Sequence, residues 1–98
     1  MSVSATWSGI ASPTTTDWIG VYTPGSGNSA YLAWIYVSCT QAPGAARSSG
    51  SCSFMLPASL AAGSYELRLL SNNGFGSLAV SSAFSVGAAA AATSALGP

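Results

Sequence analysis

Few side chains in this sequence could take part in catalysis. Asp17, Glu66, Arg47 and Arg68 are the only charged residues among the 98, and histidine and lysine are absent. General acid–base catalysis needs two titratable groups within reach of each other, and a serine nucleophile needs a neighbouring base. One isolated aspartate and one isolated glutamate make neither arrangement. The sequence therefore predicts a protein that is not an enzyme.

Motifs that bind metals, cofactors or phosphate are also missing. Two cysteines without histidine cannot complete a zinc site, and calcium needs several converging oxygens, usually from carboxylates. A phosphate-binding loop is a glycine-rich turn that leads into a helix, whereas residues 24–27 (PGSG) lead into a predicted strand. We expect no metal and no cofactor. Nucleic acid is not an expected partner either, because two arginines do not make a basic patch.

The most unusual property of the composition is its low charge. Charged residues make up 4% of the chain, against roughly 25% in an ordinary soluble domain. Three Trp, four Tyr and three Phe argue against disorder, and no uninterrupted apolar run reaches the roughly 18 residues that indicate a membrane span. A net charge near zero removes the repulsion that keeps proteins apart. Two interpretations stay open: a low-charge secreted domain, or a surface selected to associate with copies of itself.

The two cysteines, Cys39 and Cys52, indicate one disulfide, because an even number of cysteines in a small Ser/Gly/Thr-rich domain is typical of exported proteins. In the chain-entropy model, closing a loop of about a dozen residues stabilises the fold by on the order of 3 kcal/mol. Two reduced, buried thiols are the alternative. Residues 1–4 (MSVS) do not have the form of a signal peptide. We nevertheless expect a secreted or extracellular, cell-surface location.

Apolar residues alternate with polar ones in several short segments, which is the pattern of half-buried strands. Turn signals rich in Gly, Pro, Ser and Asn separate these segments, and no segment is a convincing helix. The predicted strands comprise residues 2–8, 17–22, 31–37, 51–56, 65–70 and 78–86. We predict an all-β fold, an immunoglobulin-like antiparallel β-sandwich of about seven strands. It spans residues 1–86, and residues 87–98 form an Ala-rich linker or docking tail.

The segment 31–37 (YLAWIYV) is apolar on both faces, whereas a strand of an antiparallel sandwich usually presents one polar face to water. We therefore expect a loop, a neighbouring domain or another subunit to cover its second face. Trp7, Tyr31, Trp34 and Tyr36 are the candidate interface residues, since so small a core cannot hold every aromatic ring. An exposed ring could stack on a sugar or anchor a protein interface. The alternative is that these rings belong to the core.

Two local motifs predict details of the sandwich. Leu60, Gly63 and Tyr65 place a tyrosine after a glycine-containing turn at the start of a strand, which is the arrangement of a tyrosine corner. An ordinary core tyrosine is the alternative. Residues 72–74 (NNG) are typical of a hairpin turn.

Asp17 has two predicted roles, and both are architectural. It could form an ion pair with Arg68, or it could cap the turn formed by residues 14–16. Glu66 and Arg68 are two residues apart on one strand face, so they could also form a solvated pair with each other.

Residues 2–86 resemble a known family in two separated motifs. The first comprises residues 7–9 (WSG), 12–13 (SP) and 17–22 (DWIGVY), and the second comprises residues 63–69 (GSYELRL), 71–75 (SNNGF) and 78–79 (LA). They are similar to the fibronectin type III-like N-terminal domain of purple acid phosphatases and to related repeats in secreted bacterial proteins. The resemblance implies a fibronectin type III-like sandwich with an accessory role, because the metal ligands of that family belong to a separate, larger domain. The low charge and the Cys39–Cys52 pair depart from the family pattern.

We expect from these observations a non-catalytic extracellular structural module that associates with copies of itself into a fibre, filament or surface assembly. The low charge, the doubly apolar segment 31–37 and the alternating N-terminal strand support this function, because open sheet edges can pair between molecules. The alternative is an accessory spacer or carbohydrate-binding module of a secreted enzyme, with a polysaccharide as ligand. Residues 87–98 would then be the linker to the next domain.

Overall fold

The computed structural model describes residues 2–86 and 92–97. These residues form eight β-strands and no helix: β1 (Ser2–Trp7), β2 (Trp18–Tyr22), β3 (Ala33–Tyr36), β4 (Gly50–Met55), β5 (Gly63–Ser71), β6 (Gly76–Ser81), β7 (Phe84–Val86) and β8 (Ala92–Gly97). The prediction of an all-β fold is confirmed.

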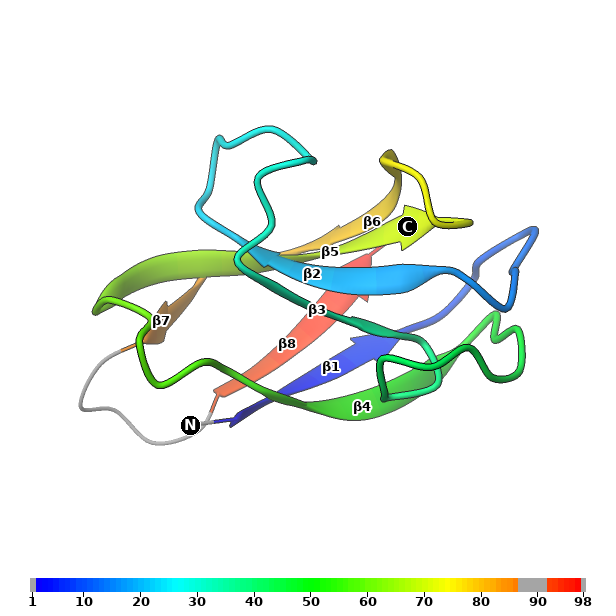
Figure 1. The fold of residues 1–98 in the computed structure, drawn as a ribbon, viewed down its shortest axis with the longest axis horizontal. Helices are drawn as coiled ribbons and strands as arrows, with labels where there is room; N and C mark the ends of the chain where they lie inside the picture. Colours follow the sequence, from blue (N-terminus) through cyan, green and yellow to red (C-terminus); the bar gives the residue numbers. More distant parts are fainter. Residues whose placement is uncertain (1, 87–91, 98) are drawn as a thin grey trace.

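The strands pair in the order β3-β2-β5-β6-β8-β1-β4, and β7 pairs with the first residues of β5. Every ladder is antiparallel except the one between β1 and β8, which is parallel. In Figure 1, β2, β3 and β5 lie to one side of the molecule, and β1, β4 and β8 lie to the other. The arrangement fits a small β-sandwich in which β3 and β4 are the two ends of the strand path.

The alternation of apolar and polar residues accounts for the core between the two layers. In β1, Val3, Ala5 and Trp7 are buried and alternate with more exposed serine and threonine side chains. Leu67 and Leu69 of β5 are fully buried in the same apolar cluster. Burying a large apolar side chain contributes about 1.5–3 kcal/mol. Since successive side chains of a strand point to opposite faces, burial of one set in the core places the other set on the outer face.

The turn expected at residues 72–74 joins β5 to β6. Asn72 and Asn73 have positive φ angles of 50° and 59°, as the central residues of a type I′ turn do, and the N–H of Gly74 closes the turn by donating to the carbonyl oxygen of Ser71 over 2.8 Å. The N–H of Asn73 donates to the carbonyl oxygen of Thr16 over 2.9 Å. This bond anchors the hairpin to the loop that precedes β2.

The opposite end of β5 carries the bond that defines a tyrosine corner. The hydroxyl of Tyr65 donates to the carbonyl oxygen of Ala61 over 2.5 Å. Leu60, which precedes this carbonyl, packs against the core, and Gly63 begins β5. The bond fixes the path of the chain as it enters the longest strand.

The structure cuts the predicted strand 31–37 at both ends and divides the predicted strand 78–86 in two. The segment 31–37 contributes only β3, because the chain turns after it: Cys39 has a φ of 71° and its N–H donates to the carbonyl oxygen of Tyr36 over 2.9 Å. The segment 78–86 is divided between β6 and β7, which pair with opposite ends of β5. Residues 82–83 belong to neither strand and separate the two.

The last described residues belong to the sheet. The segment 87–98 was expected to be a linker or docking tail, but residues 92–97 form β8, which pairs with β1 on one side and with β6 on the other. The segment forms a strand because β1 and β6 offer backbone groups with which it can pair. An Ala-rich sequence carries no periodic pattern that would predict this pairing. Residues 87–91 and 98 lie outside the described residues.

Candidate functional site

Asp17 ends the loop before β2, and 1% of its surface is exposed. Its carboxylate accepts hydrogen bonds from the backbone N–H of Thr14 over 2.9 Å and from the hydroxyl of Thr14 over 2.6 Å. A third bond comes from the backbone N–H of Asn72 over 3.0 Å. Asp17 therefore caps the turn at residues 14–16, one of its two predicted roles, and it also fastens the β5–β6 hairpin.

The predicted ion pair between Asp17 and Arg68 does not form. The guanidinium of Arg68 pairs with Glu66 over 2.8 Å and donates to the carbonyl oxygen of Ser26 and to the Oδ1 of Asn28 over 2.7 and 2.8 Å. These partners draw Arg68 toward the loop after β2, whereas Asp17 lies before β2. The Glu66–Arg68 pair is partly buried, because only 16% and 8% of the two side chains are exposed.

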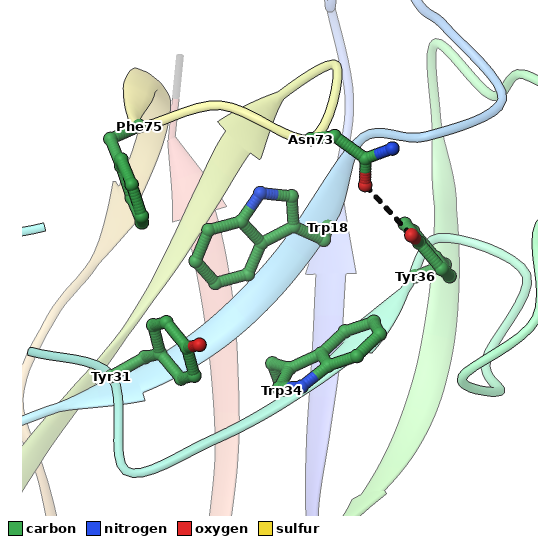
Figure 2. A pocket seen from close by; sticks show the side chains of 6 residues that line it. All are labelled: Trp18, Tyr31, Trp34, Tyr36, Asn73 and Phe75. Carbon is green, nitrogen blue, oxygen red and sulfur yellow. Dashed lines mark hydrogen bonds between the residues drawn. The ribbon is translucent and has the colours of Figure 1, made fainter. Parts of the chain in front are cut away.

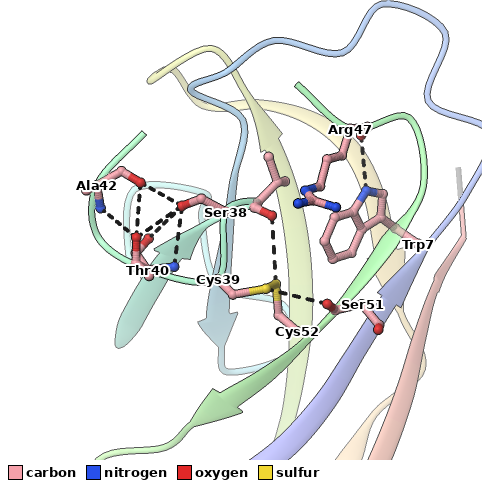
Figure 3. Close-up of a disulfide and its surroundings, with 9 residues drawn as sticks. Trp7, Ser38, Cys39, Thr40, Ala42, Arg47, Ser51 and Cys52 are labelled. Atoms are coloured by element: carbon pink, nitrogen blue, oxygen red, sulfur yellow. Dashed lines mark hydrogen bonds between the residues drawn. A yellow bond between two sulfur atoms is a disulfide. The ribbon is translucent and has the colours of Figure 1, made fainter. Parts of the chain in front are cut away.

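A disulfide links the two edge strands. Cys39 follows β3, Cys52 belongs to β4, and their Cα atoms are 5.3 Å apart across the bond (Figure 3). The predicted disulfide is confirmed. Near it, the indole Nε1 of Trp7 donates to the carbonyl oxygen of Arg47 over 3.2 Å and ties down the loop before β4. Disulfides of this kind persist in oxidising compartments.

The structure separates the four candidate interface residues. Trp7 is 4% exposed and lies in the core, so it is a core ring and not an interface residue. Tyr31, Trp34 and Tyr36 instead lie beside Trp18 on the outer face of β2 and β3. This outer face is the first candidate site.

The rings on the outer face enclose a hollow of about 180 Å³ together with residues of the β5–β6 hairpin. We call it the aromatic hollow, and it is lined by Trp18, Tyr31, Trp34, Tyr36, Asn73 and Phe75. Figure 2 shows Trp18 in the middle, with the rings of Tyr31, Trp34 and Phe75 around it. Their planes cross the plane of Trp18 at 78°, 79° and 81°, and their centroids lie 5.3, 6.4 and 6.1 Å from its centroid. The rings therefore form a box rather than a flat platform.

Hydrogen bonds and strand pairing hold the aromatic hollow in shape. The indole Nε1 of Trp18 donates to the carbonyl oxygen of Gly74 over 2.9 Å. The hydroxyl of Tyr36 donates to the Oδ1 of Asn73 over 2.7 Å. Trp18 and Tyr36 also lie directly opposite each other in the β2–β3 ladder. Both the floor of the hollow and its wall on β3 are thus fixed to the β5–β6 hairpin.

Tyr22 continues the same face of β2. A Cβ atom at Gly20 would lie 2.7 Å from the ring of Tyr22 and 3.0 Å from that of Trp18, so both rings can approach only because this residue is glycine. Burial raises the pKa of Tyr22 to about 12, although the guanidinium of Arg68, 4.2 Å from its ring centroid, acts in the opposite direction. The hydroxyl donates to the carbonyl oxygen of Asn28 over 2.6 Å. Tyr22 is thus a neutral structural donor at ordinary pH.

A second candidate surface is the groove between β3 and β4, the two ends of the strand path, and we call it the edge groove. It measures about 480 Å³ and is lined by residues 31–35, 41 and 54–57, none of them charged. Three of the large apolar side chains in it are exposed: Met55 by 72%, Leu32 by 46% and Tyr31 by 43%. The Cys39–Cys52 disulfide joins the same two strands beyond one end of the groove.

Within residues 2–86 and 92–97, no group of three or more His, Cys, Asp and Glu side chains is placed to hold a metal ion. The same residues contain no helix that could cross a membrane. No protein-family model matches the chain, and searches of curated proteins and of solved structures also found no match. The resemblance to the fibronectin type III-like domain of purple acid phosphatases stays a prediction.

Proposed function

We propose that this chain is a non-catalytic extracellular structural module that associates with copies of itself through the edge groove. The observation that carries the proposal is the uncharged groove between β3 and β4, the two ends of the strand path. On β3, the carbonyl oxygen of Trp34 and the N–H of Tyr36 are already bonded to Gln41 and Thr40, so β4 is the edge that the proposal uses for pairing. Unpaired strand edges present rows of N–H and C=O groups that pair with another chain unless charge, proline or a covering segment prevents it.

The composition of the edge groove supports self-association. Natural proteins protect open edges with charged side chains, above all lysine. Here the edges carry Leu32 and Met55, which are exposed by 46% and 72%. The chain has a net charge of zero, so long-range repulsion does not oppose contact between copies.

The disulfide supports the extracellular part of the proposal. Cys39 and Cys52 are paired, and disulfides of small domains belong mainly to oxidising compartments such as the cell exterior. The bond also links the two edges that form the groove. An assembly that forms through the edge groove would therefore be stabilised in the oxidising compartments in which the disulfide persists.

The test is the size of the particles that the purified chain forms. We expect light scattering and sedimentation at micromolar concentration to detect species larger than a monomer, and electron microscopy to detect filaments. The double variant Leu32→Glu/Met55→Glu places two negative charges in the edge groove and should be monomeric. A native chain that stays monomeric over hours would overturn the proposal.

The control variant is Val80→Glu on β6. Val80 is 44% exposed, which is close to the exposure of Leu32, but it does not line the edge groove. It should assemble like the native chain. Loss of assembly in this control as well would mean that charge in general, and not the edge groove, decides association.

A further inference from the structure

We propose that the aromatic hollow binds a quaternary ammonium group, such as the trimethylammonium group of choline. This inference rests on the geometry of the hollow and not on self-association, although Tyr31 and Trp34 line both the hollow and the edge groove. Phe75 and Asn73 of the β5–β6 hairpin complete the hollow and do not line the groove. A cation is attracted to the face of an aromatic ring within about 6 Å of its centroid, and aromatic cages use this attraction to hold quaternary ammonium ligands.

The angles between the rings favour this ligand over a sugar. Tyr31, Trp34 and Phe75 stand at 78°, 79° and 81° to Trp18, and Tyr36 stands at 82° to Trp34. A sugar ring is flat and stacks on one open ring face, whereas a trimethylammonium group is nearly spherical and can touch several faces at once. Rings that cross at right angles fit the spherical group better.

The size and rigidity of the hollow agree with a small ligand. Its volume of about 180 Å³ is below the roughly 300 Å³ at which pockets for drug-sized molecules begin. The bonds from Trp18 to Gly74 and from Tyr36 to Asn73 fix two of its sides in the absence of any ligand. A preformed site loses less conformational entropy on binding.

The charges around the hollow indicate which kind of cation it accepts. Among the residues that the structure describes, no acidic or basic side chain lines it. A primary ammonium is strongly hydrated and needs hydrogen-bond acceptors to replace its water, and a carboxylate that could do so is missing from the lining. A quaternary ammonium group has no N–H to satisfy, so aromatic faces are sufficient for it.

The protein already places a cation over a ring on this face. The guanidinium of Arg68 lies 4.2 Å from the ring centroid of Tyr22, which follows Trp18 on the same side of β2. Glu66 is 2.8 Å from Arg68 and neutralises its charge. The guanidinium of Arg68 therefore does not fill the aromatic hollow. Because Glu66 balances its charge, it also does not repel the ammonium group of a ligand.

The experiment is an NMR titration of the chain with choline chloride, following the indole N–H signals of the three tryptophans. We expect the Trp18 and Trp34 signals to shift with a Kd of about 1 mM, and the signal of the buried Trp7 to stay in place. The matched probe is 3,3-dimethylbutan-1-ol, which has the shape of choline without its charge. Equal binding of this neutral probe, or no shift with choline, would overturn the proposal.

Variants at Phe75 test whether choline binding depends on an aromatic ring face or only on the presence of a large apolar side chain. Phe75 is 52% exposed, so replacing it leaves the core intact. Phe75→Leu should weaken choline binding by about three- to fivefold, and Phe75→Tyr should retain it. Met55→Leu, outside the hollow, is the control and should bind like the native chain. Equal affinity of the Leu and Tyr variants at position 75 would contradict a cation–ring interaction.

Further probes distinguish the source of the ligand and its competitors. Phosphatidylcholine vesicles, trimethyl-lysine and free choline share the same group, and each one that shifts the Trp18 signal supports the proposal and identifies a source. Phosphatidylglycerol vesicles and ethanolamine should cause no shift. A stronger response to neutral monosaccharides or to a proline-rich peptide than to choline would overturn the proposal in favour of that ligand.

Discussion

Replacing Asp17 tests how strongly one buried carboxylate holds the outer face together. Its two oxygens accept three hydrogen bonds of 2.6 to 3.0 Å, two from Thr14 and one from Asn72. Hydrogen bonds to a charged group contribute about 1.5–3 kcal/mol each, and removal of one partner leaves the other unsatisfied. Water can reach part of the site in a truncated variant, so we expect Asp17→Ala to lower the free energy of unfolding by about 3 kcal/mol.

The amide variant Asp17→Asn should lose about half as much. Oδ1 accepts from the Thr14 hydroxyl and the Asn72 N–H, and an amide oxygen in its place keeps both bonds. The amide nitrogen then faces the N–H of Thr14, which donates to Oδ2 in the native chain, and two donors cannot bond. We therefore expect a loss of about 1.5 kcal/mol for Asp17→Asn.

The assay is urea unfolding followed by tryptophan fluorescence and circular dichroism, with thermal unfolding as a second measurement. A loss of 3 kcal/mol corresponds to a melting temperature lower by roughly 12–24 °C, and the Asn variant should lie about midway. Gln41→Ala is the control, since this exposed side chain forms one neutral hydrogen bond, to the carbonyl oxygen of Trp34, and its removal should cost less than about 1 kcal/mol. If Asp17→Ala costs no more than this control, or if Asn and Ala are equally destabilising, the reasoning is refuted.

Three further predictions concern stability. Reduction of the Cys39–Cys52 bond, which spans 13 residues in sequence, should lower the free energy of unfolding by about 3 kcal/mol, and an unchanged melting temperature in reductant would contradict this. Tyr65→Phe removes the bond to the carbonyl of Ala61 and should cost about 1 kcal/mol in urea unfolding, while Tyr31→Phe, at a residue that is 43% exposed, should cost less. The pKa of Tyr22 rises from 10.0 to about 12 on folding, so the neutral phenol stabilises the folded state. This contribution to the free energy of unfolding is complete below pH 10 and is lost as the pH rises toward 12, by about 1.4 kcal/mol per pH unit. Stability curves of the native chain and of Tyr22→Phe over this range should therefore converge, and parallel curves would refute the assignment.

The sequence was sufficient to predict the elements whose cause is local. Period-two alternation predicted β1 and β5, the residues 72–74 predicted the β5–β6 turn, and an even cysteine count predicted the disulfide. Each of these signals lies within a few residues of the feature that it describes. The immunoglobulin-like identity and the resemblance to a known family stay predictions.

Features that depend on distant residues were not predictable in the same way. Arg68 pairs with Glu66 rather than Asp17 because the loop after β2 offers it the oxygens of Ser26 and Asn28. That loop has no periodic pattern from which its path could be predicted. Glu66 lies in the same motif as Arg68 and was the alternative partner expected from the two-residue spacing, whereas the contacts of Arg68 with Ser26 and Asn28 depend on the path of this loop.

The aromatic hollow was only half visible in the sequence. Tyr31, Trp34 and Tyr36 lie in one apolar segment and were among the candidate interface residues. Trp18 and Phe75 join them only because β2 pairs with both β3 and β5, which brings the hairpin after β5 over the same face. A hairpin prediction combined with a correct strand order would have located Phe75, and the strand order was the missing information.

The parallel ladder between β1 and β8 has a mechanical consequence. Its five residue pairs run from Val3–Ala92 to Trp7–Leu96, so the N-terminal end of β1 and the C-terminal end of β8 lie at opposite ends of the ladder. Tension applied to these two ends pulls the strands past each other and loads all the hydrogen bonds of the ladder at once. In a hairpin such as β5–β6, tension at the open end would break them one after another. Shear of this kind makes the module resist extension most strongly along the line that joins the ends of β1 and β8.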